Sequence, residues 1–298
     1  MIPNEDTDVP GFWRALGLPG LIDVHVHFLP PRMMRRVWAY FDAAGPRVGT
    51  AWPIRYRWTD EQRVAHLAAL GVRAFPALAY AHRPSMAADL NGWTLDFARR
   101  TPGCLPTATF YPEPEAPGYV EAALDDGARI FKLHVQVGDF SPADPLLDPV
   151  WGMLADAGVP VVVHASSGPV PGVFTGPGPF GAMLARHPRV AAVIAHMGAP
   201  EYAEFLSLAE RFPNVRLDTT MAFTGFFEAR SPFPEALRPR LRDLGLAGKV
   251  LLGSDFPNIP YVYAHQLASL AKLELGDDWL RAVCWGGPAS LLGLDYPM

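Results

Sequence analysis

The chain has 298 residues, of which 50% are hydrophobic and 18% are charged, so it can bury a sizeable core as one large α/β barrel or as two ordinary domains. Its net charge of −5, with no basic block, argues against nucleic acid and against an anionic membrane as partners. Cys104 and Cys284 lie far apart and imply no disulfide framework. The N-terminus lacks the apolar segment of a secretory signal, and no apolar run approaches the roughly 20 residues that cross a bilayer. We therefore expect a cytoplasmic protein without membrane segments.

Short runs of β-branched residues alternate with helical patterns along the whole chain. Eight runs predict strands, over residues 21–28, 72–79, 104–110, 128–135, 159–165, 190–196, 215–220 and 249–255. Stretches with apolar residues three and four positions apart predict helices over residues 32–43, 59–71, 86–100, 117–127, 148–158 and 200–212. Alternating strands and helices are typical of parallel sheets. Eight units predict a (β/α)8 TIM barrel, with residues 1–298 as a single domain.

An open doubly wound sheet is the alternative architecture. That fold usually has a glycine-rich phosphate turn after its first strand, whereas here the first strand is followed by "HFLPPRM". The glycine- and proline-rich stretch 166–181 lacks the lysine and the spacing of a phosphate loop, so we interpret it as a lid after the fifth strand. The long connection 28–58 is rich in aromatic residues and either covers the mouth of the barrel or packs over its rim.

Polar residues stand out at the ends of the predicted strands. In "LIDVHVHFLPP", Asp23, His25 and His27 alternate with apolar residues, so all three would project from one face of a strand. Further polar residues end later strands, namely Lys132, His134, His164, His196 and Asp255. The C-terminal ends of barrel strands carry the active site. Each residue alone has an ordinary explanation, but together they would leave several buried polar groups without partners unless they bind a metal.

Four motifs, "DVHVH", "VVVHAS", "VIAHMG" and "LLGSDFP", resemble the amidohydrolase superfamily of metal-dependent barrels. "KLH", "RLDTT" and "ASLLGL" are similar to its amidohydrolase-related branch, which includes aminocarboxymuconate-semialdehyde decarboxylase-like enzymes. The resemblance covers nearly the whole chain. It implies that the metal ligands are His25, His27, His164 and Asp255. It further implies that Asp255 carries the proton of an activated water and that His196 polarises the substrate or donates a proton.

The number of metal ions stays open, and Lys132 distinguishes the two arrangements. With one ion, for which zinc is expected, Lys132 stays charged and contacts a substrate carboxylate. With two ions, a carboxylated Lys132 bridges them and His196 becomes a ligand of the second. Iron or manganese would also suit nitrogen and carboxylate ligands.

Three further residues are candidates for supporting roles. His134 shares the strand face of Lys132 and would also contact the substrate. Arg83 follows the second strand and could hold a substrate carboxylate with a bidentate pair of hydrogen bonds. Asp23 would lie deeper than His25, and it would either accept a hydrogen bond from a ligand histidine or make a helix or turn contact at the bottom of the barrel.

Two reactions use this set of ligands. The first is hydrolysis of a small amide, lactone or ester, in which metal-activated water attacks the carbonyl, His196 stabilises the oxyanion and Asp255 passes the proton to the leaving group. The second is non-oxidative decarboxylation of an unsaturated or aromatic carboxylic acid, with His196 promoting protonation at carbon. A barrel without catalytic activity would need no metal. The expected partner is a small-molecule substrate, and a homodimer is left open because no helix face identifies an interface.

Overall fold

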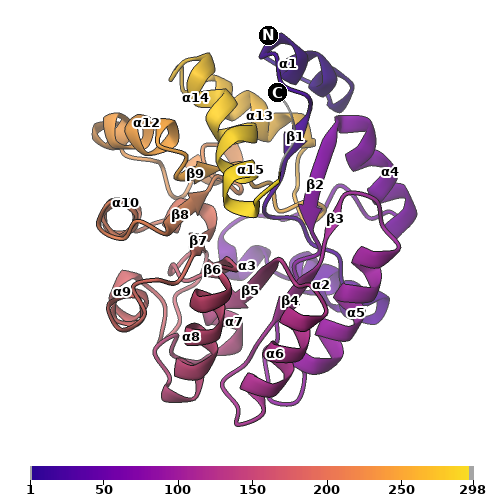
Figure 1. The fold of residues 1–298 in the computed structure, drawn as a ribbon. Helices are drawn as coiled ribbons and strands as arrows, with labels where there is room; N and C mark the ends of the chain where they lie inside the picture. The colour runs from indigo at the N-terminus through magenta and orange to yellow at the C-terminus, as the bar shows by residue number, and fades with distance from the viewer. Residues whose placement is uncertain (1, 295–298) are drawn as a thin grey trace. The chain divides into compact units, whose positions relative to one another are not determined.

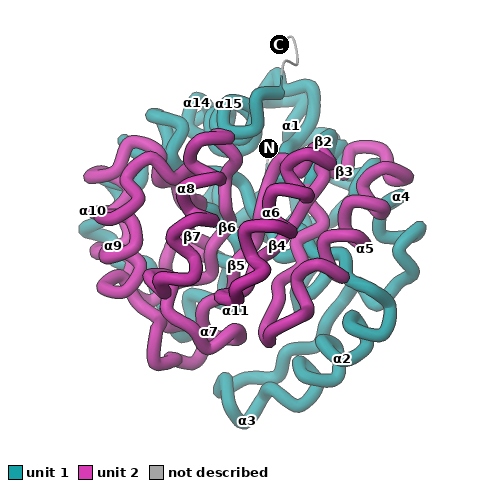
Figure 2. Tube along the Cα trace, turned by 60° about the horizontal axis from the view of Figure 1, so that its bottom comes forward, with its two compact units in different colours: residues 1–75, 218–298 teal, residues 76–217 magenta. Residues whose placement is uncertain are grey.

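The computed structural model describes residues 2–294 and divides the chain into two compact units. Unit 1 comprises residues 1–75 and 218–298, and unit 2 comprises residues 76–217 (Figure 2). A single domain over residues 1–298 stays a prediction. No helix within residues 2–294 is both long enough and apolar enough to cross a membrane.

Unit 2 is built on a parallel sheet in which neighbouring strands follow one another along the chain. Its strands are β4 (Thr107–Thr109), β5 (Ile130–His134), β6 (Val161–His164), β7 (Ala192–Ile194) and β8 (Val215–Asp218, whose last residue belongs to unit 1). The register places Lys132 opposite Val162 and His134 opposite His164. All four residues of β6 are buried, as expected for a strand of a covered parallel sheet.

Helices cover one side of this sheet (Figure 1). The longer ones are α5 (Ala87–Arg99), α6 (Ala116–Asp125), α8 (Asp148–Ala157), α9 (Pro177–Arg186) and α10 (Tyr202–Arg211). The short elements of the unit are β3 (Cys104–Leu105), α7 (Val135–Gly138) and the 3₁₀ turns Pro145–Leu147 and Ala195–Gly198.

In unit 1, the chain beginning at β1 (Leu21–Ile22) has parallel neighbours on two sides. On one side β1 pairs with β2 (Val72–Pro76, whose last residue belongs to unit 2). On the other side, the residues after β1 pair with the residues after β9 (Val250–Leu251). The N–H of Val24 donates to the carbonyl oxygen of Leu252 (2.9 Å), and that of His27 to Phe256 (2.8 Å). The segment that carries both histidines is therefore held against the segment that carries Asp255.

The helices of unit 1 are α1 (Val9–Ala15), α2 (Pro31–Asp42), α3 (Gly45–Val48), α4 (Asp60–Leu70), α11 (Gly225–Glu228), α12 (Arg238–Leu246), α13 (Tyr263–Ala271), α14 (Asp277–Arg281) and α15 (Gly287–Leu292). Two 3₁₀ turns, Asp6–Asp8 and Glu235–Leu237, and a π-helical turn, Ala282–Gly286, complete the unit. Helix α4 illustrates the local signals. Thr59 caps its start in a reciprocal pair of hydrogen bonds with Gln62, and Gly71 ends it in a left-handed conformation (φ 84°).

Each of the eight predicted strand runs contains a strand, but the strands are shorter than the runs, and three differences from the prediction have a clear local cause. Pro106 has no N–H and separates β3 from β4 within the run 104–110. Strand β1 ends at Ile22, because Oδ1 of Asp23 accepts the N–H of His25 (3.0 Å) and turns the chain. The stretch 166–181 is a loop only as far as Gly176, and α9 begins at Pro177, where proline suits the first turn of a helix.

Candidate metal centre

Three of the predicted ligands lie together in unit 1. The Nε2 atoms of His25 and His27 lie 3.4 and 2.9 Å from Oδ1 of Asp255. One ligand atom from each residue can be chosen so that all three lie within 4.8 Å of one another. The side chains are nearly buried, with exposed fractions of 1%, 6% and 8% for the residues in that order. We call this group the His–His–Asp cluster.

The cluster fits a divalent metal in both chemistry and spacing. Two imidazoles and a carboxylate suit zinc, and they also suit manganese or iron. Two ligand atoms that each lie about 2.1 Å from a tetrahedral ion are separated by about 3.4 Å. The separations of 3.4 and 2.9 Å from Asp255 are near this value, so an ion would need only small adjustments of the side chains. Three protein ligands leave a further position, which a fourth ligand, water or substrate could occupy.

His25 is held from three directions. Its N–H donates to Oδ1 of Asp23 (3.0 Å), and its carbonyl oxygen accepts the N–H of Asp255 (2.9 Å). Its ring Nδ1 lies 2.8 Å from Oδ2 of Asp218, which is fully buried. The backbone and the ring of His25 are thus both fixed, and its Nε2 is the atom directed at Asp255.

Asp255 adopts a left-handed backbone conformation (φ 71°), which is uncommon for any residue except glycine. Surrounding hydrogen bonds hold it there. Its N–H donates to His25, its carbonyl oxygen accepts the N–H of Asn258 (2.9 Å), and the next N–H, from Phe256, donates to Oγ of Ser254 (3.0 Å). A conformation of this kind persists only where the surroundings determine it, and such residues cluster at functional sites.

Asp23 is fully buried, but it does not take the first of the two roles expected for it beside His25. It contacts the backbone N–H of His25, and its Oδ2 accepts the hydroxyl of Tyr263 (2.9 Å). Burial raises the pKa of Asp23 to about 7, although hydrogen bonds from Ser254, the His25 N–H and Tyr263 act in the opposite direction. The carboxylate that meets the ring of His25 is Asp218, so of the two expectations for Asp23 the structure shows the turn contact at this histidine.

The remaining histidines of the predicted site lie in unit 2, where three of their rings meet. His134 and His164 stack, with ring centroids 4.1 Å apart and planes at 9°, and His196 meets His164 edge-on at 4.9 Å. His196 has a left-handed conformation (φ 55°). The Nε2 of His164 donates to the carbonyl oxygen of Gly168 (2.8 Å), so Nδ1 is the nitrogen of His164 that a metal could use.

The two predicted cationic contacts differ in burial. Lys132 lies within β5 and is 1% exposed, and its carbonyl oxygen accepts the hydroxyl of Thr109 (2.8 Å). An ammonium group buried to this extent needs compensating partners. Arg83 is exposed in the turn between β2 and α5. Substrate contacts by these residues and by His134 stay predictions.

Sequence reasoning missed Asp218. It ends β8 within "RLDTT", and its position at the end of a predicted strand was the signal that could have identified it. Its Oδ1 accepts the N–H of Thr220 (3.1 Å), which is the same local turn that Asp23 makes with His25.

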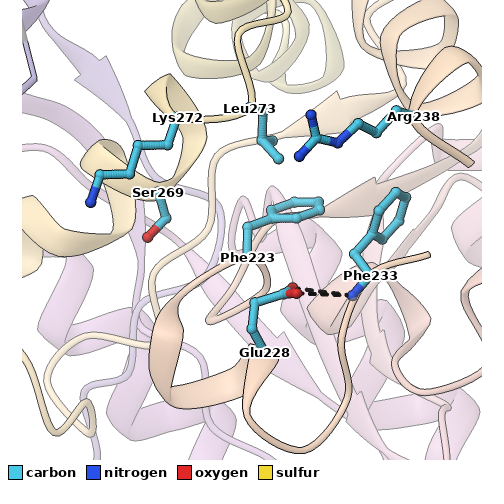
Figure 3. Close-up of a pocket in the computed structure, with 7 residues that line it drawn as sticks. All are labelled: Phe223, Glu228, Phe233, Arg238, Ser269, Lys272 and Leu273. Atoms are coloured by element: carbon cyan, nitrogen blue, oxygen red, sulfur yellow. Dashed lines mark hydrogen bonds between the residues drawn. The ribbon is translucent and has the colours of Figure 1, made fainter. Parts of the chain in front are cut away.

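Unit 1 also contains a cavity of about 220 Å³ (Figure 3). Its lining residues are Phe223, Glu228, Phe233, Arg238, Ser269, Lys272 and Leu273. The rings of Phe223 and Phe233 meet edge-on at 5.1 Å, and the carboxylate of Glu228 accepts the N–H of Phe233 (3.1 and 3.2 Å). Burial raises the pKa of Glu228, against the opposing hydrogen bonds and the charge of Arg238. The lining contains no member of the His–His–Asp cluster, so the cavity is not part of that cluster.

A family model described as "Amidohydrolase" matches residues 22–294. No curated protein matches the chain. The chain is similar to the uncharacterised TIM-barrel protein Bb4693 from Bordetella bronchiseptica, with 20% identity, a TM-score of 0.72, and coverage of 92% of this chain and 99% of that chain. This similarity confirms the predicted (β/α)8 barrel.

Two further similar structures have named activities. One is 5-carboxyvanillate decarboxylase LigW2 from Novosphingobium aromaticivorans, solved with bound manganese, with 13% identity, a TM-score of 0.65, and coverage of 92% of this chain and 97% of that chain. The other is dihydroorotase from Campylobacter jejuni, with 15% identity, a TM-score of 0.56, and coverage of 94% of this chain and 84% of that chain.

Proposed function

This chain belongs to the amidohydrolase family and is a metal-dependent enzyme, and we propose that it hydrolyses a small amide, lactone or ester at the His–His–Asp cluster. The observation that carries the proposal is the convergence of two imidazole nitrogens and a carboxylate oxygen in unit 1. The metal proposed is zinc. Manganese is the alternative, and the similarity to a manganese-containing decarboxylase supports it.

Each residue of the cluster has a proposed role in metal binding or proton transfer. His25 and His27 would hold the metal with Nε2, and Asp255 would hold it with Oδ1. A bound divalent ion would supply Lewis-acid activation of water or of a carbonyl oxygen. Asp255 has a second oxygen, and its side chain is 12% exposed, so this carboxylate can accept a proton from water and pass it to a leaving group. We propose His164 as a fourth metal ligand. His196 would polarise the substrate, and Lys132 would contact a carboxylate group of the substrate.

Decarboxylation of an unsaturated or aromatic carboxylic acid is the second candidate. The similarity to 5-carboxyvanillate decarboxylase favours it, whereas the similarity to dihydroorotase favours hydrolysis. The two reactions differ in what they release, because decarboxylation releases CO₂ and hydrolysis opens or cleaves the substrate.

The test is a metal and activity measurement on purified protein. We expect one zinc or manganese ion per chain, loss of that ion in His27→Ala and Asp255→Asn, and turnover within a panel of lactones, amides, esters and aromatic acids. His187→Ala is the control, because His187 pairs with Asp148 (2.8 Å), outside the predicted site. Turnover with CO₂ release would show that the enzyme is a decarboxylase and not a hydrolase. Both proposals would be overturned if the wild-type protein contained no stoichiometric metal, or if His27→Ala and Asp255→Asn retained the wild-type metal content.

A further inference from the structure

We infer that Asp218 is a positioning residue, which holds His25 in the tautomer and the orientation that present Nε2 to the metal. The inference rests on the proposed function, because it concerns how the protein prepares one ligand of that metal. It starts from the 2.8 Å contact between Oδ2 of Asp218 and Nδ1 of His25.

The chemistry of the pair determines where the proton lies. Asp218 is fully buried and His25 is 1% exposed, so water does not compete for this hydrogen bond. An ionised carboxylate can only accept, so this contact favours the tautomer in which Nδ1 of His25 carries the proton. In the neutral ring, Nε2 is then left with a lone pair, and it lies 3.4 Å from Oδ1 of Asp255. This is the arrangement in which a carboxylate orients a metal-binding histidine and increases its basicity.

Asp218 is itself held in place. Its Oδ1 accepts the N–H of Thr220 (3.1 Å), which leaves Oδ2 for His25. Gly253 makes the close approach possible. A Cβ at this position would lie 2.9 Å from Cβ of His25 and 3.2 Å from Cβ of Asp218. No side chain can separate the two residues without moving one of them.

Two other aspartates contact a histidine or its backbone in a different way. Asp23 binds the backbone of His25 and fixes the chain, not the ring. Asp148 binds His187 at the same distance of 2.8 Å, but this pair is more exposed (17% and 35%) and lies outside the predicted site. Asp148 therefore provides a matched control for removing a carboxylate from a histidine.

The experiment measures metal affinity and the ring protonation of His25 in the full-length protein. Asp218→Asn keeps the shape of the side chain, but its amide can donate to Nδ1 and favour the tautomer with the proton on Nε2, where the metal should bind. We expect Asp218→Asn to weaken the affinity for Zn²⁺, measured by competition with a chromophoric chelator, on the order of 10–100-fold. Asp148→Asn should change it less than about twofold. In the metal-free wild type, ¹⁵N–¹H spectra of the histidine rings should show His25 protonated on Nδ1, and the variant should lose this signature.

The outcomes separate the two proposals. A wild type that binds no Zn²⁺ or Mn²⁺ overturns the proposed function together with this inference. A wild type that binds metal, beside a folded Asp218→Asn protein of unchanged affinity, overturns this inference alone. A His25 ring protonated only on Nε2 in the metal-free wild type overturns it as well, and that measurement needs no variant.

Discussion

His25 and Asp255 contact each other twice, once through the backbone and once through their side chains. The N–H of Asp255 donates to the carbonyl oxygen of His25 (2.9 Å), and Oδ1 of Asp255 lies 3.4 Å from Nε2 of His25. The same residues therefore join the first and last strands of the chain and supply two of the candidate ligands. Metal binding at this cluster should be coupled to the stability of unit 1, because an ion would add a further link between two segments that hydrogen bonds already join.

Metal should accordingly stabilise the folded protein. At free Zn²⁺ of about 100 times the dissociation constant, we expect the free energy of unfolding to rise by about 2.7 kcal/mol, since the ion binds the folded state. Chemical denaturation with Zn²⁺ and with a chelator measures this difference. His27→Ala should lose most of it, because the variant retains only two members of the cluster. Equal stabilisation of wild type and variant would show that the ion binds elsewhere.

Gly253→Ala should lower both stability and metal affinity. The added Cβ would lie 2.3 Å from Oγ1 of Thr220 and 2.9 Å from Cβ of His25, so the backbone must shift. Overpacking of a buried site costs about 1–3 kcal/mol. The control is Gly92→Ala, at an exposed position in α5 where a Cβ meets nothing within 4 Å. That substitution should stabilise the protein by roughly 0.5–1 kcal/mol. If Gly253→Ala binds Zn²⁺ as tightly as wild type, the close packing of His25 against Asp218 does not determine affinity.

Much of the fold and part of the site were accessible from the sequence. Runs of β-branched residues mark strands, and apolar spacing with glycine stops marks helices, because both patterns follow from local geometry. The histidines of the first run and Asp255 were expected as ligands through the resemblance to the amidohydrolase superfamily, and the structure brings these three residues together. The length of β1 could not be predicted. Asp23 has the alternation of a strand residue, but its side chain binds a backbone N–H two residues later and ends the strand.

Asp218 was missed for a different physical reason. It lies 193 residues from His25 in the chain, and a hydrogen bond between side chains depends on their final positions, not on local pattern. An aspartate at a strand end is also common in turns. The tautomer of His164 was likewise inaccessible, because it depends on the carbonyl oxygen of Gly168 in the following loop. The sequence thus indicated which residues to expect at the site, whereas contacts such as that between Asp218 and His25 depend on the folded structure.

The stability of unit 1 should fall in acid because of Asp6. Its Oδ2 accepts hydrogen bonds from the hydroxyl of Tyr56 (2.5 Å) and from Nε2 of His66 (2.9 Å), and its Oδ1 accepts the N–H of Ala264 (2.9 Å). Burial raises the pKa of Asp6, but these hydrogen bonds outweigh it, and the pKa lies below its ordinary value of 3.8. The ionised form is therefore the one that the fold prefers. Its contribution is fully present above the unfolded pKa and is lost as pH falls through the lower folded value.

Asp6→Asn tests this expectation. The free energy of unfolding should decrease by about 1–3 kcal/mol at pH 7, because buried donors lose a charged acceptor. The difference between wild type and variant should shrink as pH falls below 4, which denaturation curves across that range would reveal. Asp96→Asn is the control, since Asp96 is 70% exposed and pairs with an exposed Arg99, and it should change stability little. A difference that stays constant with pH would mean that the Asp6 charge is not the cause.

Tyr263→Phe should separate the role of Asp23 from that of Asp218. Tyr263 is buried and donates its hydroxyl to Oδ2 of Asp23 (2.9 Å), so the variant removes a donor from a fully buried carboxylate. We expect a loss of about 1–3 kcal/mol in the free energy of unfolding. Zn²⁺ affinity should change only a few-fold, because Asp23 contacts the backbone of His25 and leaves its ring to Asp218. Chelator competition and denaturation on the same preparations measure both quantities. Tyr40→Phe, at a residue 46% exposed, should change neither. If Tyr263→Phe weakens metal binding as much as Asp218→Asn does, the two carboxylates act on His25 as one unit, and the division between backbone and ring is wrong.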